Sequence, residues 1–311
     1  MELRQLRYFV RIVDLGSLSK AAVDLYVAQP ALSKQVAALE SELKASLLVR
    51  SPRGVAPTEA GLAFYRQAQS VLRQLARVPD EVRSAAASPT GAVAVGMPFS
   101  ASNILAPALV AAVRERLPGI RLAITQEGSG QLEGLLASGR LDLSLLYERT
   151  RPSPQIDEQP LLVEELFLVT RAPGGRGEVA LADAARQRLI LPGPLNSTRQ
   201  VVEGAFAKAG LVLDLAAEVD VPWTMKAMVA AGLGATIVSR SALYPERAED
   251  GLIARRIVRP VLTRALNLCT RRGETPARAG ALVAETLAAA ARGLIERGAW
   301  RGAVPARRRQ A

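Results

Sequence analysis

Apolar residues recur at helical spacing from the start of the chain and predict two consecutive short helices. The positions spaced for one buried face of the first helix are Leu3, Leu6, Phe9, Val10 and Val13. Gly16 then interrupts the pattern, and the hydroxyl of Ser17 is suited to cap the second helix. The inner face predicted for the second helix consists of Ala21, Ala22 and Leu25.

A third helix is predicted after a tight connection and begins near Pro30, because proline is favoured in a first helical turn. Its buried stripe is expected to consist of Leu32, Val36, Leu39 and Leu43. The residues left near its exposed N-terminal end are Gln29, Ala31, Ser33, Lys34 and Gln35. The major groove of DNA admits a helix end, and its base edges bind amide, hydroxyl and cationic groups. The second and third helices therefore predict a DNA-binding helix-turn-helix.

Two short runs follow this helix, at 47–50 and 54–57, and predict a pair of strands joined by a tight turn. Arg53 lies at the tip of that turn. A hairpin beside a helix-turn-helix, with a cation at its tip, is typical of a wing.

A long helix is then predicted, since Thr58 and Glu59 make a good helix start. Its near-heptad apolar positions are Ala63, Tyr65, Ala68, Leu72, Leu75 and Val82. Such a seam suits pairing with a second copy of the chain or, alternatively, packing within the chain. Pro79 removes a backbone hydrogen bond and clashes with the preceding turn, so we expect a kink there or an end near Val78.

From Gly91 onward, apolar strands alternate with helical segments, which predicts a mostly parallel α/β architecture with two lobes. The strands expected in the first lobe are 92–97, 120–126 and 141–146, with helices at 102–117 and 131–137. A second lobe is expected from Leu161, with strands at 166–170, 189–191, 215–219 and 235–238. A strand at 265–270 and a helix at 277–296 return to the first lobe, so two connections would cross between the lobes and form a hinge.

Composition excludes several function classes. The 311 residues include no histidine, which excludes His-dependent catalytic triads and His-ligated zinc. The single cysteine, Cys269, excludes an internal disulfide and a cysteine metal cluster, and it is expected to be a buried strand residue. Neither a bilayer-spanning apolar run nor a secretory signal is recognisable, so we expect a cytoplasmic protein, with no metal or cofactor.

The net charge of +11 is unevenly distributed. Residues 1–90 contain 12 Lys or Arg and 8 Asp or Glu, residues 91–254 contain 15 and 18, and residues 255–311 contain 13 and 3. The basic N-terminal part is suited to DNA phosphates, whereas the near-neutral middle is typical of a globular sensor. The Arg-rich end, 301–311, is expected to be a solvated basic tail.

The first sixty residues resemble those of LysR-type transcriptional regulators. The ordered strings that carry the resemblance are Leu3-Arg4-Gln5-Leu6-Arg7-Tyr8-Phe9, Gly16-Ser17-Leu18, Ala21-Ala22, Gln29-Pro30-Ala31-Leu32-Ser33-Lys34-Gln35, Leu39-Glu40 and Pro57-Thr58-Glu59-Ala60-Gly61. The resemblance implies a winged helix-turn-helix at 1–58, a linker and dimerisation helix at 59–88 and an effector-binding domain at 89–300. In that domain, which is similar to periplasmic solute-binding proteins, lobe I would span about 91–160 plus 265–297 and lobe II about 161–264.

The resemblance also implies which residues contact DNA. The expected set is Gln29, Pro30, Ala31, Ser33 and Lys34 in the major groove and Arg53 in the flanking minor groove. Gln29 can read adenine through a paired amide contact, and Lys34 suits guanine or a phosphate. Taken singly, each of these side chains is equally well explained as solvated surface. Ala28 departs from the Ser or Thr that is common in the family, so a capping hydroxyl is missing.

The strings Gly139-Arg140-Leu141-Asp142-Leu143 and Met228-Val229-Ala230-Ala231-Gly232-Leu233-Gly234 extend the resemblance to the effector domain. Ligands in such folds lie at the carboxyl ends of strands, beside helix N-termini. The expected effector contacts are Ser100, Ser102, Ser129 and Tyr147 from one lobe and Asn196, Ser197 and Thr198 from the other. Hydroxyl and amide groups suit a small organic anion. The alternative is that Ser100, Ser102 and Thr198 only cap helices.

The implied partners are inverted-repeat promoter DNA, RNA polymerase and a second or further copies of the chain, in a dimer or tetramer. The N-terminal stretch and 191–197 look most like the nitrogen assimilation control branch of the family, in which regulation can act through protein abundance instead of an effector. A solute-binding protein explains the lobes but not residues 1–60. An enzyme finds candidate acid–base groups in Glu127, Asp142 and Glu164 but no catalytic motif, so no enzymatic activity is expected.

Overall fold

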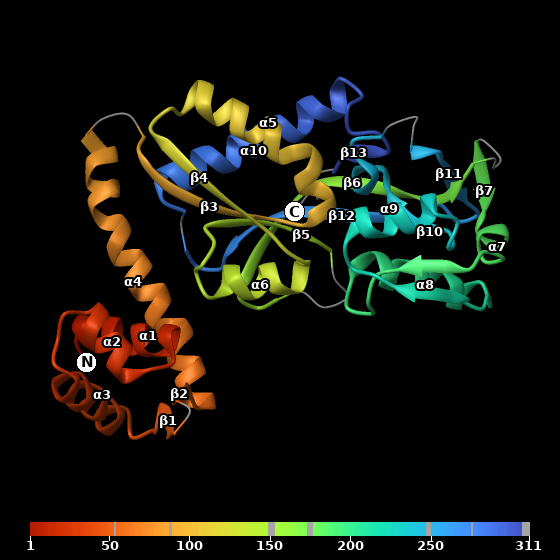
Figure 1. The fold of residues 1–311 in the computed structure, drawn as a ribbon. Helices are drawn as coiled ribbons and strands as arrows, with labels where there is room; N and C mark the ends of the chain where they lie inside the picture. Colours follow the sequence, from red (N-terminus) through yellow and green to blue (C-terminus); the bar gives the residue numbers. More distant parts are fainter. Residues whose placement is uncertain are drawn as a thin grey trace. The chain divides into compact units, whose positions relative to one another are not determined.

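The computed structural model describes residues 1–52, 54–86, 89–148, 153–172, 177–246, 250–274 and 276–306 (Figure 1). Contacts divide the chain into two compact units. The first is built from Met1–Val82, and the second from Arg83–Ala137 and Leu141–Ala311. Each unit is described below by itself.

The first unit contains the predicted helix-turn-helix and wing. Its elements are α1 (Leu3–Leu15), α2 (Leu18–Asp24), α3 (Gln29–Leu43), β1 (Leu48–Ser51), β2 (Gly54–Pro57) and the long α4 (Glu59–Ala86). Gly16 ends α1 with a φ of 61°, a conformation that glycine adopts without strain. The Ser17 hydroxyl caps α2 by accepting from the Lys20 N–H. Both predicted helix boundaries are therefore confirmed.

A small apolar core orients α3. It is formed by fully buried side chains from all three helices, chiefly Phe9, Ile12, Leu32, Val36 and Leu39. The predicted buried positions Leu3 and Leu43 are instead 45% and 39% exposed, and each is the terminal residue of its helix. The α4 helix continues past Pro79 to Ala86, so the end predicted near Val78 is not observed.

The second unit begins with lobe I, an α/β layer structure. Its main elements are β3 (Gly91–Met97), α5 (Phe99–Arg116), β4 (Ile120–Gln126), α6 (Ser129–Ala137), β5 (Leu143–Tyr147), β12 (Thr263–Arg271) and α10 (Arg278–Glu296). The strand order is β4-β3-β5-β12, with β3 parallel to β4 and β5 and β12 antiparallel to β5. In Figure 1, α5 and α10 cover one face of this sheet and α6 the other. Leu145 and Leu146 accordingly belong to different apolar clusters, as alternation along a strand requires.

Lobe II consists of a second group of strands and the helices that pack on them. Its elements are β7 (Glu178–Ala180), α7 (Leu181–Ala184), β8 (Leu189–Leu191), α8 (Ser197–Lys208), β9 (Leu215–Glu218), α9 (Pro222–Ala230), β10 (Thr236–Ser239), the 3₁₀ turn η1 (Arg240–Leu243) and β11 (Leu252–Val258). The four strands predicted here from apolar runs are confirmed. The strands β7 and β11 were not predicted, because one is very short and two adjacent arginines, Arg255 and Arg256, interrupt the apolar run of the other.

One long strand, β6 (Ile156–Arg171), passes from lobe I to lobe II. Its first part, up to Glu165, pairs with β12, and its second part, from Leu166, pairs with β10 and β11. The first crossing between the lobes is thus a continuous strand. The return crossing lies between β11 and β12.

The C-terminal segment corrects the prediction of a solvated tail at 301–311. Residues Ala303–Pro305 form β13, which pairs antiparallel with β6. Trp300 is 1% exposed and Ala303 is 8% exposed, so burial of these apolar side chains holds the segment on lobe I. Residues 307–311, which include the arginines 307–309, lie outside the described residues.

Candidate functional site

The N-terminal end of α3 forms the first candidate site. Gln29, Pro30, Ala31 and Lys34 are exposed and Ser33 is half-buried, while the opposite face of the helix packs on the core of the first unit. The helix begins after Ala28, whose side chain cannot accept a hydrogen bond from the first turn. The free N–H groups of that turn are therefore available to a phosphate oxygen. Arg53, the expected wing contact, lies outside the described residues.

Two side chains that were not predicted as part of this site form hydrogen bonds with polar side chains of α3. The Ser19 hydroxyl donates to the Gln29 Oε1 at 3.0 Å, and the Arg50 Nη2 donates to the Ser33 Oγ at 3.2 Å. The amide oxygen of Gln29 is thus engaged, which leaves its NH₂ group to donate outward. Because an amide oxygen has two lone pairs, Gln29 can still form the expected paired contact with adenine while it accepts from Ser19.

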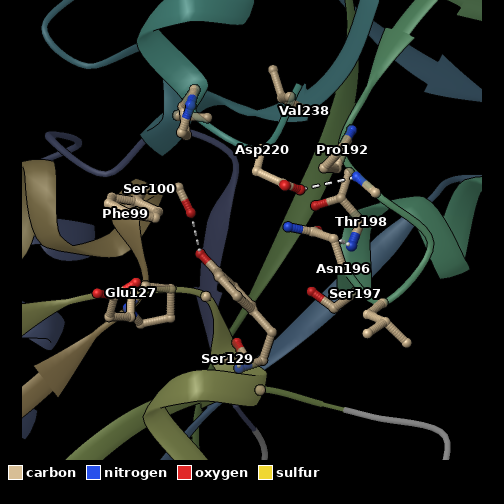
Figure 2. Close-up of a pocket in the computed structure, with 18 of the residues that line it drawn as sticks. Phe99, Ser100, Glu127, Ser129, Pro192, Asn196, Ser197, Thr198, Asp220 and Val238 are labelled. Atoms are coloured by element: carbon tan, nitrogen blue, oxygen red, sulfur yellow. Dashed lines mark hydrogen bonds between the residues drawn. The ribbon is translucent and has the colours of Figure 1, made fainter. Parts of the chain in front are cut away.

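The second candidate site is a pocket between the two lobes of the second unit, with a volume of about 780 Å³. The N-terminal turns of α5, α6, α8 and α9 supply residues to its lining, as expected at the carboxyl ends of strands. Figure 2 shows Ser100, Ser129, Asn196, Ser197 and Thr198 around this space.

Six of the seven side chains expected at the effector site line this pocket: Ser100, Ser129 and Tyr147 from lobe I, and Asn196, Ser197 and Thr198 from lobe II. Ser102 does not. Its side chain is buried, and its Oγ accepts from the Gln126 Nε2 at 2.5 Å. Its predicted role as a ligand contact is therefore not supported by its position.

Several of the lining groups already have partners within the protein. The Asn196 Oδ1 accepts from the Thr198 N–H at 2.9 Å and caps α8. The Ser129 Oγ accepts from the Tyr147 N–H at 3.3 Å, and the hydroxyls of Ser100 and Tyr147 lie 2.9 Å apart. Helix capping thus accounts for Asn196, but the Tyr147 and Ser100 hydroxyls belong to a buried polar network.

A buried ion pair, Glu164 with Arg264, lies at the centre of that network. Arg264 lines the pocket, and its Nε and Nη2 donate to the Glu164 Oε2 at 3.1 and 2.9 Å. The Arg264 side chain is only 6% exposed and the Glu164 side chain only 1%. The guanidinium also lies over the Tyr147 ring, 3.6 Å from its centroid.

Arg264 connects the two lobes. Its Nη1 donates to the Thr198 Oγ1 at 2.7 Å, and its Nη2 donates to the Ser100 Oγ at 3.0 Å and the Ser239 Oγ at 2.6 Å. The predicted set of effector contacts did not include Arg264. The available signal was its place directly before the expected strand at 265–270, between Leu262 and Leu266, since an arginine is almost never fully buried without a partner.

The surroundings set the protonation of both acidic groups in the network. Burial alone would raise the pKa of Glu164, but the charge of Arg264 and hydrogen bonds from Ser241, Trp300 and Tyr147 outweigh it and hold the pKa below its usual value. Burial raises the pKa of the Tyr147 phenol well above its usual value. At neutral pH Glu164 is therefore a carboxylate and Tyr147 a neutral phenol.

The comparisons with known proteins agree with this division into two sites. The family profile described as "Bacterial regulatory helix-turn-helix protein, lysR family" matches residues 3–62, and that described as "LysR substrate binding domain" matches residues 86–292. The chain belongs to the LysR family of transcriptional regulators. It is a DNA-binding transcriptional regulator with an effector-binding domain.

The relatives of this LysR-type regulator include the nitrogen assimilation regulatory protein nac of Klebsiella aerogenes, 40% identical over 78% of this chain and 79% of that protein. The nac protein of Escherichia coli K12 is 36% identical over the same shares of the two chains. These similarities support the predicted branch. Among solved structures, full-length CbnR in complex with its target DNA is 25% identical, with a TM-score of 0.71, and the match covers 94% of this chain and 99% of that one.

Two of the carboxylates considered for acid–base chemistry in this LysR-type regulator have structural roles. The Asp142 Oδ2 accepts from the Ala94 N–H at 2.8 Å, and Glu164 is the buried ion-pair partner described above. Cys269 is buried in β12. Among the residues that the structure describes, no three His, Cys, Asp or Glu side chains are grouped as metal ligands. In the same residues, no helix combines the length and the apolarity that crossing a membrane requires.

Proposed function

We propose that this regulator binds an inverted-repeat promoter site as a dimer or tetramer, reads bases with the N-terminal end of α3, and acts on transcription through RNA polymerase. In this proposal 1–58 form the DNA-binding domain, 59–88 the linker and 89–300 the sensor. The chain would act in the cytoplasm, where the chromosome is, and would catalyse no reaction. The observation that carries the proposal is the exposed, polar end of α3 on a rigid three-helix core.

The residues proposed to contact DNA are Gln29, Pro30, Ala31, Ser33, Lys34 and Arg53. Arg50 joins them, because its hydrogen bond to Ser33 places a second cation beside the reading surface. In the part of α4 whose side chains are described, Leu62, Val71, Leu75 and Val78 are exposed. Phe64 and Tyr65 pack on the core of the first unit instead. Val71, Leu75 and Val78 lie on one face of the helix, whereas Leu62 lies on the opposite face. We infer that the strip of Val71, Leu75 and Val78 pairs with the second copy; it keeps Leu75 of the predicted seam but not Tyr65.

The decisive experiment replaces both Gln29 and Lys34 with alanine in the full chain. Loss of one base-reading amide and one cation is expected to weaken binding to the native promoter by about 100-fold, with a much smaller loss on unrelated DNA. Fluorescence anisotropy at several salt concentrations measures both, and the slope against log salt should fall by about 1 for the lost cation.

Lys44→Asn is the matched control for this experiment. Lys44 is an exposed cation at the other end of α3, with a positive φ that asparagine tolerates. It should leave promoter selectivity unchanged. A double variant that binds its promoter as tightly and as selectively as the parent would exclude α3 as the reading element.

For the sensor, we propose that a small molecule in the interlobe pocket favours one interlobe geometry, and that the oligomer transmits this preference to the spacing of its DNA-reading domains. The pocket volume and the hydroxyl and amide groups of its lining support this proposal. Control by protein abundance without an effector is the second candidate, favoured by the similarity to the nac proteins. DNase footprints with and without a panel of metabolites separate the two, because only the first predicts a changed footprint.

A further inference from the structure

The carboxylate of Glu164 is surrounded by donors from widely separated parts of the second unit. Its Oε1 accepts from the Ser241 Oγ at 2.5 Å and from the Trp300 Nε1 at 2.8 Å. Its Oε2 accepts from the Tyr147 OH at 2.8 Å and from Arg264. These donors belong to β5, β12, η1 and the C-terminal segment, so lobe I, lobe II and the end of the chain all contribute.

This environment has the chemistry of a binding site for a carboxylate ligand. A guanidinium, two hydroxyls and an indole N–H converge on one carboxylate that is 1% exposed. Stability alone is a poor explanation for it, because a buried ion pair is often no more stabilising than well-packed apolar residues of similar volume. The arrangement does specify how the lobes meet, since Arg264 donates to Ser100 of lobe I and to Thr198 and Ser239 of lobe II.

The resident carboxylate also changes which ligands suit the pocket. A ligand carboxylate at Arg264 would share one cation with Glu164, and the surplus negative charge would be buried without compensation. Among the described lining residues, the charged side chains other than Arg264 are Glu127 and Asp220, both of them acidic and drawn in Figure 2. The fixed charges of the pocket thus disfavour an organic anion, contrary to the expectation from the lining hydroxyls alone.

We propose that Glu164 is the resident ligand of a carboxylate site that joins the two lobes, and that the pocket above it takes a neutral or positively charged effector. The second half of the statement rests on the proposed sensor function, whereas the first half concerns the chain alone. Glu164 then occupies the place that the carboxylate of a small organic acid would fill, and the lobes are held together at the pocket floor without any bound molecule.

Chemical rescue in the full-length protein tests the proposal. Glu164→Ala removes the carboxylate and leaves space beside Arg264, and we expect the Tm to fall by roughly 10 °C because a buried guanidinium is left uncompensated. Formate and acetate, supplied as sodium salts, should restore much of this loss in a concentration-dependent manner. Sodium chloride at matched ionic strength should restore far less. The wild-type protein should gain no more Tm from formate, acetate or succinate than from chloride.

Two variants serve as controls. Glu165→Ala removes the next carboxylate along β6, which pairs with Arg256 near the surface, and should show neither a large fall in Tm nor a rescue. Glu164→Ala combined with Arg264→Met removes the cation as well, so formate should have no specific effect. Rescue of this double variant, or a wild-type Tm that rises with formate as much as that of the alanine variant, would overturn the proposal.

The alanine variant is purified in formate buffer and, separately, in chloride buffer. Soluble protein in the formate buffer but not in the chloride buffer supports the proposal. A folded variant that formate does not stabilise contradicts it. Should neither buffer yield folded protein, Glu164→Asp and Glu164→Gln take the place of the alanine variant. The aspartate variant is expected to have the higher Tm, because it keeps the negative charge. A higher Tm for the glutamine variant contradicts the proposal. None of these measurements involves DNA, so their failure would leave the proposed DNA-reading function intact.

Discussion

The two candidate sites differ in the state of their cations. Lys34, at the reading end of α3, is exposed, whereas the side chain of Arg264, at the floor of the interlobe pocket, is 6% exposed and lies 2.9 Å from Glu164. A solvated cation remains available to DNA phosphates and bases, and its contribution falls as salt rises. A buried cation needs a partner at all times, and this chain supplies one. The exposed Lys34 is thus suited to binding another molecule, whereas the buried pair of Arg264 and Glu164 is suited to fixing how the lobes meet.

The largest effect is expected from breaking the buried pair on its basic side. Arg264→Met leaves the Glu164 carboxylate uncompensated in the interior, and the free energy of unfolding should fall by about 3–5 kcal/mol. Adding Glu164→Leu removes the stranded charge and should restore most of that loss, as urea denaturation of the two variants can measure.

Arg256→Met is the control for this cycle, because Arg256 pairs with Glu165 where water screens the charges, and only a minor change is expected. Equal unfolding free energies for Arg264→Met and the double variant would show that the two buried residues do not act as a unit.

The next largest effect is expected in the pH dependence of stability, through the buried carboxylate of Glu164. The pKa of Glu164 in the folded protein lies below its usual value, despite burial, because of Arg264 and three hydrogen bonds. Its contribution is therefore complete above the pKa of the unfolded chain and is lost as the pH falls through the folded-state value. Urea denaturation between about pH 7 and pH 3 should show a steeper fall in stability for the wild type than for Glu164→Gln. Parallel curves would mean that Glu164 does not titrate in this way.

The sequence allowed the first unit to be predicted almost completely, because its information is local. Gly16 and Ser17 define helix ends within one or two residues, and the stripe of Leu32, Val36 and Leu39 is set by helical periodicity. The errors in its buried faces include Leu3 and Leu43, which keep the apolar pattern but are exposed as the terminal residues of their helices.

The pocket was predictable only in part, since its lining and its floor have different origins. The family resemblance, together with helix N-termini that follow strands, implied Ser100, Ser129 and Asn196. The ion pair of Arg264, which lines the pocket, with Glu164, which lies behind it, could not be predicted, because the two residues are 100 positions apart and meet only through the antiparallel pairing of β6 with β12. Trp300, which completes the site, directly precedes the segment 301–311, whose arginines predicted a solvated tail, and no local pattern marked its indole as a donor.

The smallest effect is expected from Ser19→Ala, which tests the reading surface without removing a group that would contact a base. Loss of the 3.0 Å hydrogen bond frees the amide of Gln29 to rotate, so affinity for the promoter should fall by a fewfold, in keeping with about 0.5–1.5 kcal/mol for one such bond. In the Gln29→Ala background the same change should have no effect, because the bond is already absent. Anisotropy measurements on the four proteins give this cycle. An undiminished effect of Ser19→Ala without Gln29 would show that Ser19 acts on DNA directly and not by orienting the glutamine.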